Sequence, residues 1–379
     1  MSVTPRRVLF WLHLTAGVIA GTVIFFLSVT GTCLAFERQM IGWADGSHRI
    51  VPHDGMRQPL SALIENVQNY AHAPATAIAV HGDSSLPLEV TVGREPARVV
   101  LVDPYSGAIV GESAPRLRKF FAEVTALHRW FGMQGDNRAV ARSIKGAFTL
   151  AMLFLVCSGI VLWMPRKWTR NRINKSLFFR RDLEGRARDW NRHNVIGIWL
   201  AVPLLVIVLT GVIMAYPWAN DLLYRLAGNA LPPQQSETVQ RGTTHAHGNH
   251  AVATVPRIET LMTVASQQIP DWRTITVRLN PVTLQVDRGD GGRPDLRTQI
   301  TLNDSGRVLR TESFSSYNKG RQLRAWARFT HTGEAGGIVG EIIAVVASIG
   351  AAALAWTGFA LALRRLPFPK NKRLETSIS

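Results

Sequence analysis

Apolar stretches of about 20 residues alternate with long polar segments along this chain of 379 residues. A helix of that length spans the roughly 30 Å hydrocarbon core of a bilayer, so each stretch predicts a transmembrane helix. The stretches are Val8–Phe36, Ala147–Met164, Val195–Tyr216 and Ile338–Leu363. With their flanking residues they define predicted membrane segments 1–36, 144–165, 193–216 and 338–363.

Two polar segments, 37–143 and 217–337, are each long enough for a small domain. In each, an amphipathic helical stretch comes first, and segments of alternating apolar and polar residues follow. This order predicts an α+β domain with an antiparallel meander. The predicted helices are Leu60–Ala71 and Ile258–Gln268, and the predicted strands are Ala75–Val80, Leu86–Val92, Arg98–Val102, Ala108–Gly111, Thr274–Leu279, Thr283–Asp287, Gln299–Leu302 and Arg307–Thr311.

The order of membrane helix, α+β domain and membrane helix occurs twice, with a period of roughly 180 residues. The sequence therefore predicts an α-helical integral membrane protein whose four core helices form a parallel tandem repeat. Two α+β domains lie on one side of the membrane, between the helices of each repeat.

Charge sets the orientation of this arrangement. The formal net charge is +17, but the first seven residues, segment 166–192 and the tail 364–379 together carry +13 of it. Basic residues gather on the cytoplasmic side of membrane proteins. We therefore expect both termini and the 166–192 loop in the cytoplasm and both α+β domains outside, with the lipid bilayer as the partner of the chain. The basic runs orient the protein, and no nucleic acid is expected to bind.

Two of the predicted membrane helices carry the same rare pattern. His13-x-x-x-Gly17 is followed by Thr30-Gly31, and His193-x-x-x-Gly197 is followed by Thr210-Gly211, with identical spacing. A histidine inside a membrane helix costs free energy unless it binds something, so both are functional candidates. His13 and His193 are expected at the same depth, near the cytoplasmic face.

A second pair of histidines precedes the other two membrane helices on the outside. His128 comes before the second helix and His331 before the fourth. Two histidines at each face suit the bis-histidine ligation of b-type haem, which needs no open coordination position. No C-x-x-C-H is present, so covalently attached haem is excluded.

The glycines of the repeated pattern agree with this interpretation. Gly31 lies about 27 Å along a helix from His13, at the opposite leaflet, and Gly211 stands in the same relation to His193. A flat macrocycle needs helices without bulky side chains where it lies. Alternatively, these small residues simply allow close helix packing.

Arginines near the outer histidines could neutralise haem propionates or attract an anionic substrate. The candidates are Arg129, Arg142 and Arg328, with Arg138, Lys145 and Arg324 nearby. Alternatively, they are charges at the level of the lipid headgroups.

Segment 231–256 is rich in Pro, Gln, Thr, Gly and His and predicts a linker. His245, His247 and His250 within it form either a metal-capture tract or an incidental part of the linker.

Several of these sequences together resemble the PepSY-associated transmembrane family, over nearly the whole chain. They are Trp11-Leu12-His13-Leu14, Val102-Asp103-Pro104-Tyr105-Ser106-Gly107, Leu127-His128-Arg129, Arg192-His193 and Thr330-His331-Thr332-Gly333. The Asp-Pro-Tyr-x-Gly turn is similar to the PepSY signature. Its second copy, Asn303-Asp304-Ser305-Gly306, departs from it.

The resemblance implies two periplasmic PepSY-like domains on a bacterial inner-membrane protein. The family includes di-haem reductases of siderophore iron such as ferrioxamine, which implies haem ligation by His13, His193, His128 and His331. The expected function is reduction of ferric siderophores in the periplasm by outer-sphere electron transfer, with no acid–base or nucleophilic residue. The chain has no nicotinamide or flavin motif, so an unknown cytoplasmic or membrane donor must supply the electrons.

Two alternatives from other classes stay open. The chain could be a non-enzymatic accessory protein whose PepSY-like domains bind a partner, or a component of a siderophore or metal transporter that uses the histidine tract for capture.

Overall fold

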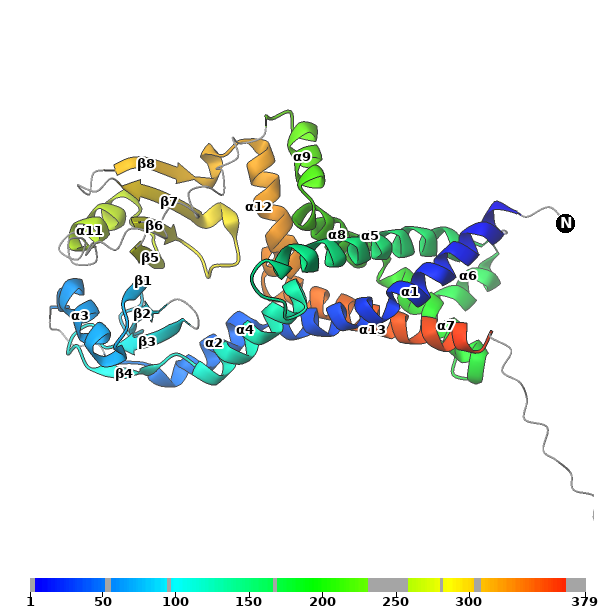
Figure 1. The fold of residues 1–379 in the computed structure, drawn as a ribbon, viewed down its shortest axis with the longest axis horizontal. Helices are drawn as coiled ribbons and strands as arrows, with labels where there is room; N and C mark the ends of the chain where they lie inside the picture. The colour runs from blue at the N-terminus through cyan, green and yellow to red at the C-terminus, as the bar shows by residue number, and fades with distance from the viewer. Residues whose placement is uncertain are drawn as a thin grey trace, which may run out of the picture. The chain divides into compact units, whose positions relative to one another are not determined.

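The computed structural model describes residues 4–51, 56–93, 97–165, 169–230, 258–279, 282–302 and 308–365. The chain divides into two compact units. The helical unit comprises Met1–Thr32, His128–Ala215 and Ile342–Ser379, and the sheet unit comprises Cys33–Leu127 and Tyr216–Glu341. Figure 1 shows the elements of both units.

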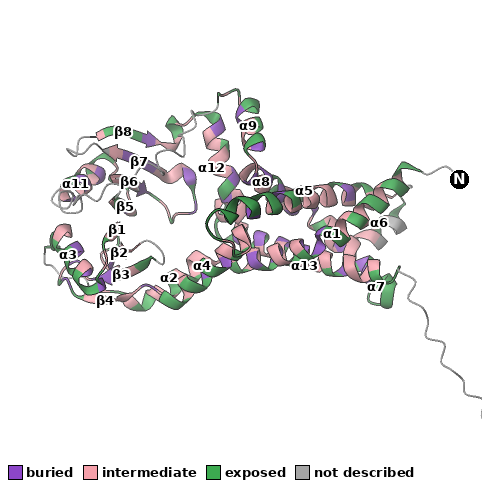
Figure 2. Cartoon of the chain, viewed as in Figure 1, coloured by how far each residue is buried: buried purple, intermediate pink, exposed green. Residues whose placement is uncertain are grey.

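The helical unit contains long apolar helices that are connected by shorter ones. The long helices are α1 (Pro5–Leu34), α5 (Asn137–Trp163) and α13 (Gly337–Leu363), and the shorter ones are α6 (Arg170–Leu177), α7 (Gly185–Trp199) and α8 (Ala201–Ala215). In the described part of the chain, three helical segments are long and apolar enough to cross a membrane, or four if α7 and α8 together form one span. Exposed residues lie along these helices (Figure 2). The apolar side chains of Ile19, Val202 and Ile349 are among them. Such surfaces suit contact with lipid tails.

The third predicted membrane helix, 193–216, is not one straight helix. It is divided between α7 and α8, whose axes differ by 65°. Pro203 has no N–H to donate to the carbonyl of Trp199, so the helical hydrogen bonding is interrupted where Leu200 leaves helical geometry (φ −97°, ψ 3°). The apolar composition continues across the bend, which is why hydropathy alone did not reveal it.

The second membrane helix begins earlier than expected. Helix α5 starts at Asn137, inside the segment 37–143 that the sequence assigns to the first domain. Residues 137–143 are mostly polar, so a prediction based on apolar runs leaves them out of the membrane helix. They nevertheless form two turns of the same helix. These turns belong to the helical unit.

The sheet unit holds one sheet of eight antiparallel strands in the order β4-β3-β2-β1-β5-β6-β7-β8. The first half contributes α2 (Glu37–Asp45), η1 (Gly46–His48), α3 (Leu60–Ala71), β1 (Ala75–His81), β2 (Leu88–Val92), β3 (Arg98–Val102), β4 (Ile109–Glu112) and α4 (Pro115–Trp130). The second half contributes α9 (Pro217–Leu226), α11 (Ile258–Gln268), β5 (Thr274–Leu279), β6 (Val282–Asp287), η3 (Pro294–Leu296), β7 (Arg297–Leu302), β8 (Val308–Ser313), η4 (Phe314–Ser316), α12 (Lys319–Thr332) and η5 (Glu334–Gly336). The two predicted amphipathic helices are therefore present with the predicted bounds.

The expectation of two separate α+β domains is corrected by the pairing of β1 with β5. Ile78 lies opposite Val277 and Val80 opposite Ile275, so the two four-stranded meanders join into one sheet. A first strand left at the edge of each meander would expose unpaired N–H and C=O groups, and this pairing satisfies both edges at once. The sequence predicts each meander, but it does not predict which edge strand of one meander pairs with the other meander.

Alternate positions of the strands form a continuous apolar face. Ile78 and Val90 of the first half pack under α3, and Val277 and Leu284 of the second pack with residues of α11. All four are fully buried. Because Ile78 and Val277 are directly paired, both helices lie on the same side of the sheet.

The Asp103–Gly107 turn closes the β3–β4 hairpin through its own side chains. The Asp103 carboxylate accepts hydrogen bonds from the N–H of Tyr105 (2.9 Å) and the hydroxyl of Ser106 (2.6 Å). Gly107 has a φ of 73°, and its carbonyl accepts from Asn66 of α3 at 2.6 Å. The turn therefore fastens the hairpin to the helix that covers it. The corresponding turn, 303–306, lies outside the described residues.

We expect Ile78→Ala to destabilise the sheet unit by about 2–5 kcal/mol, since it empties space at the centre of the joined sheet. Thermal unfolding of the full-length protein in detergent, followed by circular dichroism, measures the effect. Leu309→Ala on β8 is the control, because Leu309 is exposed and its loss should cost no more than about 0.5 kcal/mol. Equal midpoints for the two variants would contradict the central position of the β1–β5 pair.

Candidate histidine site in the helical unit

His13 of α1 contacts a hydroxyl on α5. Its Nδ1 lies 2.7 Å from the Oγ of Ser158. That hydroxyl also donates to the carbonyl of Phe154, one turn earlier in the helix, at 2.6 Å. The imidazole is thus held by a neighbouring helix rather than by its own.

His193 repeats this arrangement in the second half of the chain. Its Nδ1 lies 2.9 Å from the Oγ1 of Thr357 on α13. Thr357 in turn donates to the carbonyl of Ala353 at 2.8 Å. The tandem repeat that the sequence predicts therefore extends to individual hydrogen bonds.

These hydrogen bonds determine which ring nitrogen carries the proton. A hydroxyl has a single hydrogen, and in Ser158 and Thr357 the helix carbonyl takes it. The hydroxyl can then only accept from the histidine, so Nδ1 carries the hydrogen. Nε2 keeps its lone pair, which is the form of imidazole that ligates metal.

Glycines flank both rings. A Cβ on Gly159 would lie 3.6 Å from Cε1 of His13, and one on Gly358 would lie 3.6 Å from Cε1 of His193. Each glycine directly follows the hydroxyl residue that holds the ring. The Ser-Gly and Thr-Gly pairs thus supply a hydrogen-bond acceptor and the space for the imidazole beside it.

A cavity of about 700 Å³ connects the two histidines. His13 and His193 both line it, together with small residues on α1, α5, α7, α8 and α13: Gly17, Gly21, Gly159, Gly197, Ala201, Ala351, Ala355 and Gly358. Sites for cofactors commonly have volumes of roughly 300–1,000 Å³ and mostly apolar walls. Four arginines, Arg6, Arg7, Arg186 and Arg365, line the same cavity. Two imidazoles, several small residues and four cationic groups that line one cavity match the needs of a flat, carboxylate-bearing macrocycle.

His128, in the last turn of α4, has the same kind of partner. Its Nδ1 lies 2.8 Å from the Oγ1 of Thr30 on α1, and Thr30 donates to the carbonyl of Phe26 at 2.9 Å. A Cβ on Gly31 would lie 3.4 Å from Cε1 of His128. The Thr30-Gly31 end of the repeated pattern therefore adjoins His128, a histidine from the second predicted pair.

The fourth histidine, His331, lies in the last turn of α12 in the sheet unit. Gly333 ends this helix with a φ of 84°, and a Cβ there would lie 2.5 Å from the carbonyl oxygen of Gly340, so only glycine fits. Thr210 on α8 donates to the carbonyls of Val206 and Ile207, as Thr30 does in its own helix, and Gly211 follows it. The pairing of His128 with His331 stays a prediction.

Three guanidinium groups surround Trp130 in the helical unit. Arg129, Arg138 and Arg142 lie 5.2, 5.9 and 5.6 Å from its ring centroid. Two of the predicted propionate partners, Arg129 and Arg142, thus share one aromatic contact, and the indole face favours this concentration of positive charge.

Arg328, the third predicted arginine, lies on α12 with its guanidinium 5.1 Å from the centroid of Phe329. Arg324 lies one turn earlier on the same face. Burial lowers the pKa of the Arg324 guanidinium, and the neighbouring charge of Arg328 lowers it further, whereas Tyr224 opposes the shift. This part of α12 is therefore a cationic stripe that approaches His331.

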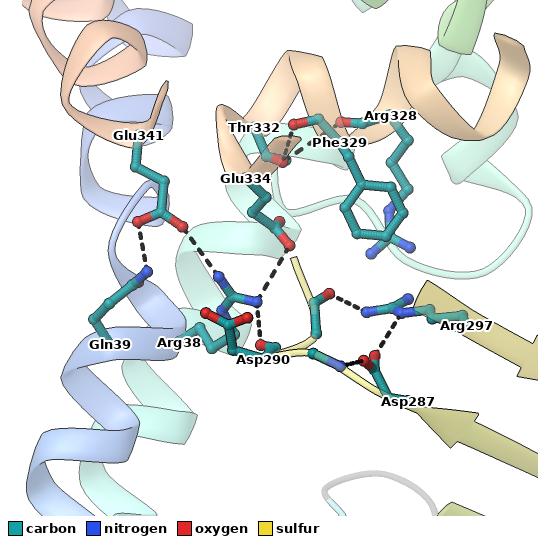
Figure 3. Close-up of polar contacts among 12 residues, drawn as sticks. Arg38, Gln39, Asp287, Asp290, Arg297, Arg328, Phe329, Thr332, Glu334 and Glu341 are labelled. Atoms are coloured by element: carbon teal, nitrogen blue, oxygen red, sulfur yellow. Dashed lines mark hydrogen bonds and ion pairs between the residues drawn. The ribbon is translucent and has the colours of Figure 1, made fainter. Parts of the chain in front are cut away.

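A buried carboxylate braces the corner that follows His331. Glu341, in the first turns of α13, is 1% exposed. Its carboxylate accepts from Arg38 Nη2 at 3.2 Å and from Gln39 Nε2 at 2.5 Å (Figure 3). Arg38 also donates to the carbonyl of Asp290 at 2.5 Å. One guanidinium therefore connects α2, the β6–β7 connection and the start of α13.

Arg297 extends this network into the sheet. Its Nε donates to the Asp287 carboxylate at 3.0 Å, and its guanidinium lies 4.8 Å from the ring of Phe329 on α12 (Figure 3). Helix α12, which carries His331, therefore contacts the β6–β7 hairpin through Phe329 and Arg297, and the ion pair with Asp287 holds Arg297 within the hairpin.

Sequence reasoning missed several of these residues. It did not single out Ser158 and Thr357 as partners of the histidines, and it treated Arg6, Arg7, Arg186 and Arg365 only as charges that orient the chain. The signal was present, since Ser-Gly and Thr-Gly occupy matching places in the second and fourth apolar helices. Glu341 is the only acid in the apolar run Ile338–Leu363, and this isolated charge was a further sign of a residue with a specific partner. His245, His247 and His250 lie outside the described residues.

Apolar helices of membrane-spanning length together with an antiparallel sheet define a membrane-associated protein of mixed architecture. The chain matches the family model described as the PepSY-associated TM region over residues 10–365. The chain therefore belongs to this family, as the sequence resemblance predicted. No curated protein matches the chain.

We expect Glu341→Gln to destabilise the protein by about 1.5–3 kcal/mol, since it removes the charge that accepts from Arg38. The thermal midpoint of the full-length protein measures this. Glu334→Gln is the matched control: Glu334 lies 4.0 Å from Arg38 and is more exposed, so its change should cost less than about 1 kcal/mol. A larger effect of the control would show that Glu341 does not brace this corner.

Proposed function

We propose that this protein is a membrane electron-transfer protein that binds two b-type haems and reduces ferric siderophores. The single observation that carries the proposal is the pair of imidazoles, His13 and His193, that line one cavity with Nε2 in the metal-binding form. When bound, haem supplies an iron that alternates between Fe(III) and Fe(II) and carries one electron at a time.

The residues of the cavity fit such a cofactor. His13 and His193 would be the axial ligands, and Ser158 and Thr357 would hold their rings. Gly17, Gly159, Gly197 and Gly358 leave the walls flat enough for a macrocycle. Apart from the four arginines, the described lining of the cavity is mostly apolar, and the positive charge of these arginines can pair with propionates.

A second haem is proposed, with His128 and His331 as its ligands. Thr30 would fix the His128 ring, while Gly31 and Gly211 would leave space beside the ligands. Arg129, Arg142 and Arg328 are the candidates to neutralise the propionates of this group. Support comes from the first site, because the hydroxyl, glycine and histidine around His128 repeat its geometry.

The proposed orientation follows the charge distribution. The basic N-terminus, the 166–192 loop and the tail would lie in the cytoplasm of a bacterium, with the sheet unit in the periplasm. Electrons would then enter at the His13–His193 site and leave at the His128–His331 site.

The proposed substrate is Fe(III) held by the hard oxygen ligands of a siderophore. These ligands bind Fe(III) more strongly than Fe(II), so reduction releases the metal. Outer-sphere transfer needs no acid, base or nucleophile, and the role of this chain is to position its cofactors. Family membership supports this choice of substrate, and so does the predicted placement of two histidines at each face of the membrane.

Purified protein from haem-replete cells should contain about two haems per chain and, once reduced, release Fe(II) from a ferric siderophore. His193→Ala should lose the haem of its own site and abolish electron passage from the cytoplasmic side. Visible spectra of the dithionite-reduced protein and a ferrous-iron chelator assay measure the two effects.

His72→Ala is the matched control, because His72 is an exposed residue at the end of α3. It should leave both readouts unchanged. A colourless protein, or a haem-loaded one that reduces none of several ferric siderophores, would contradict the proposal and favour an accessory or transport role.

Thr357→Val should weaken haem retention at the His193 site by about 10–100-fold, since the ring loses the acceptor that fixes its tautomer. Haem transfer to apomyoglobin measures this retention. Thr149→Val is the matched control, because Thr149 also donates to the carbonyl four residues earlier but is not one of the hydroxyl residues that hold a histidine in the described part of the chain. Equal retention in both variants would show that the hydroxyl does not position the ligand.

A further inference from the structure

The His13–His193 cavity is cationic without any compensating acid. Of the described residues that line it, Arg6, Arg7, Arg186 and Arg365 are charged, and none is Asp or Glu. Arg7, Arg186 and Arg365 are also exposed, so the basic end of the cavity reaches the surface. We call these four residues the basic mouth.

The neighbours of the basic mouth do not neutralise it. Arg6 donates to the carbonyls of Leu162 and Met164 at 2.5 and 2.7 Å, and Arg365 lies 4.4 Å from the ring centroid of Phe10. Those partners are uncharged. Within the part of the chain that the structure describes, none of the four arginines forms an ion pair.

Of the acids nearest Arg186 in the sequence, Asp182 and Asp189 are already paired, and Glu184 is exposed and does not line the cavity. Asp182 contacts Arg180 at 2.5 Å, and Asp189 contacts Arg364 at 2.9 Å, both outside the cavity lining. If a haem with two propionates fills the cavity, as proposed above, two of the four positive charges stay unmatched. The mouth therefore has capacity for a second anion.

An exposed aromatic ring adjoins this charge. Trp190 lies one helical turn after Arg186 and three residues before His193 on α7, and all three line the cavity. Its side chain is 53% exposed. A planar aromatic molecule with a phosphate group can stack on this indole and pair with the neighbouring guanidinium.

We propose that the basic mouth binds a reduced flavin nucleotide, the electron donor that this chain itself lacks. The inference rests on the proposed function. A bis-histidine iron has no open position for a hydride, so its donor must release single electrons, as flavins can. The flavin ring can stack on Trp190. Its phosphate can pair with the arginines that the haem propionates leave without a counter-charge.

The electron balance is simple. One reduced flavin gives up two electrons and two protons and becomes oxidised flavin. The protons pass to water, and the electrons leave one at a time, so that two ferric centres become ferrous. Nothing else is consumed.

A matched pair of probes tests the proposal. Flavin mononucleotide and riboflavin share the same ring and differ by the phosphate. Binding of the oxidised probes to the full-length protein in neutral detergent, followed by flavin fluorescence, should favour the mononucleotide by about tenfold at low salt. Arg186→Gln should remove most of this preference, and high salt should weaken it.

Arg181→Gln is the control variant, since Arg181 is an exposed residue of the same basic loop that does not line the cavity. It should leave the preference intact. A second readout is the rate of haem reduction, which should be faster with the reduced mononucleotide than with reduced riboflavin.

Equal affinity for the two probes, or equal effects of Arg181→Gln and Arg186→Gln, would overturn the proposal. So would loss of the preference in nanodiscs with anionic lipid, because lipid headgroups would then occupy the arginines. A haem-loaded protein that fails these tests refutes the donor site alone. A haem-free protein that still prefers the mononucleotide refutes the proposed function instead.

Discussion

The hydrogen bond between a helix hydroxyl and a histidine Nδ1 is the interaction on which the candidate site depends. It occurs at Ser158, Thr357 and Thr30, each time with the hydroxyl hydrogen committed to a carbonyl of its own helix. This commitment leaves the hydroxyl only an accepting role and therefore fixes the tautomer of the ring. Among mostly apolar side chains few other polar groups compete for the imidazole, so a neutral hydroxyl suffices to orient it. The glycine after each hydroxyl residue lets the ring approach the helix.

The sheet unit is governed by a different constraint, which is the need to satisfy strand edges. Each half of the chain folds its own meander, and β1 and β5 then pair to give one apolar face under α3 and α11. The polar network of Arg38, Gln39 and Glu341 fixes the start of α13 to this unit. A buried carboxylate with two donors is costly to break, because its removal leaves Arg38 without its closest anion. The helix corner after His331 is thereby given one defined geometry.

Much of this could be read from the sequence. The apolar runs predicted the long helices, the alternating segments predicted the strands, and the bounds of α3 and α11 were correct because amphipathic periodicity is a local property. The repeated histidine pattern also singled out His13 and His193, which line one cavity. The bend at Leu200 and the polar first turns of α5 were missed, because hydropathy averages over a bend and does not register polar residues that continue a helix.

The sequence by itself determined which elements form, that they form twice, and which histidines lie in or beside apolar helices, where an imidazole without a partner is costly. These follow from local periodicity and from the free energy of placing an imidazole among apolar residues. Only the tertiary structure decided that the two meanders share one sheet and that Ser158 and Thr357 face the histidines. It alone also placed Arg6, Arg7, Arg186 and Arg365 around one cavity. Such pairings join residues more than a hundred positions apart, and no local pattern encodes which of several equivalent partners a side chain meets.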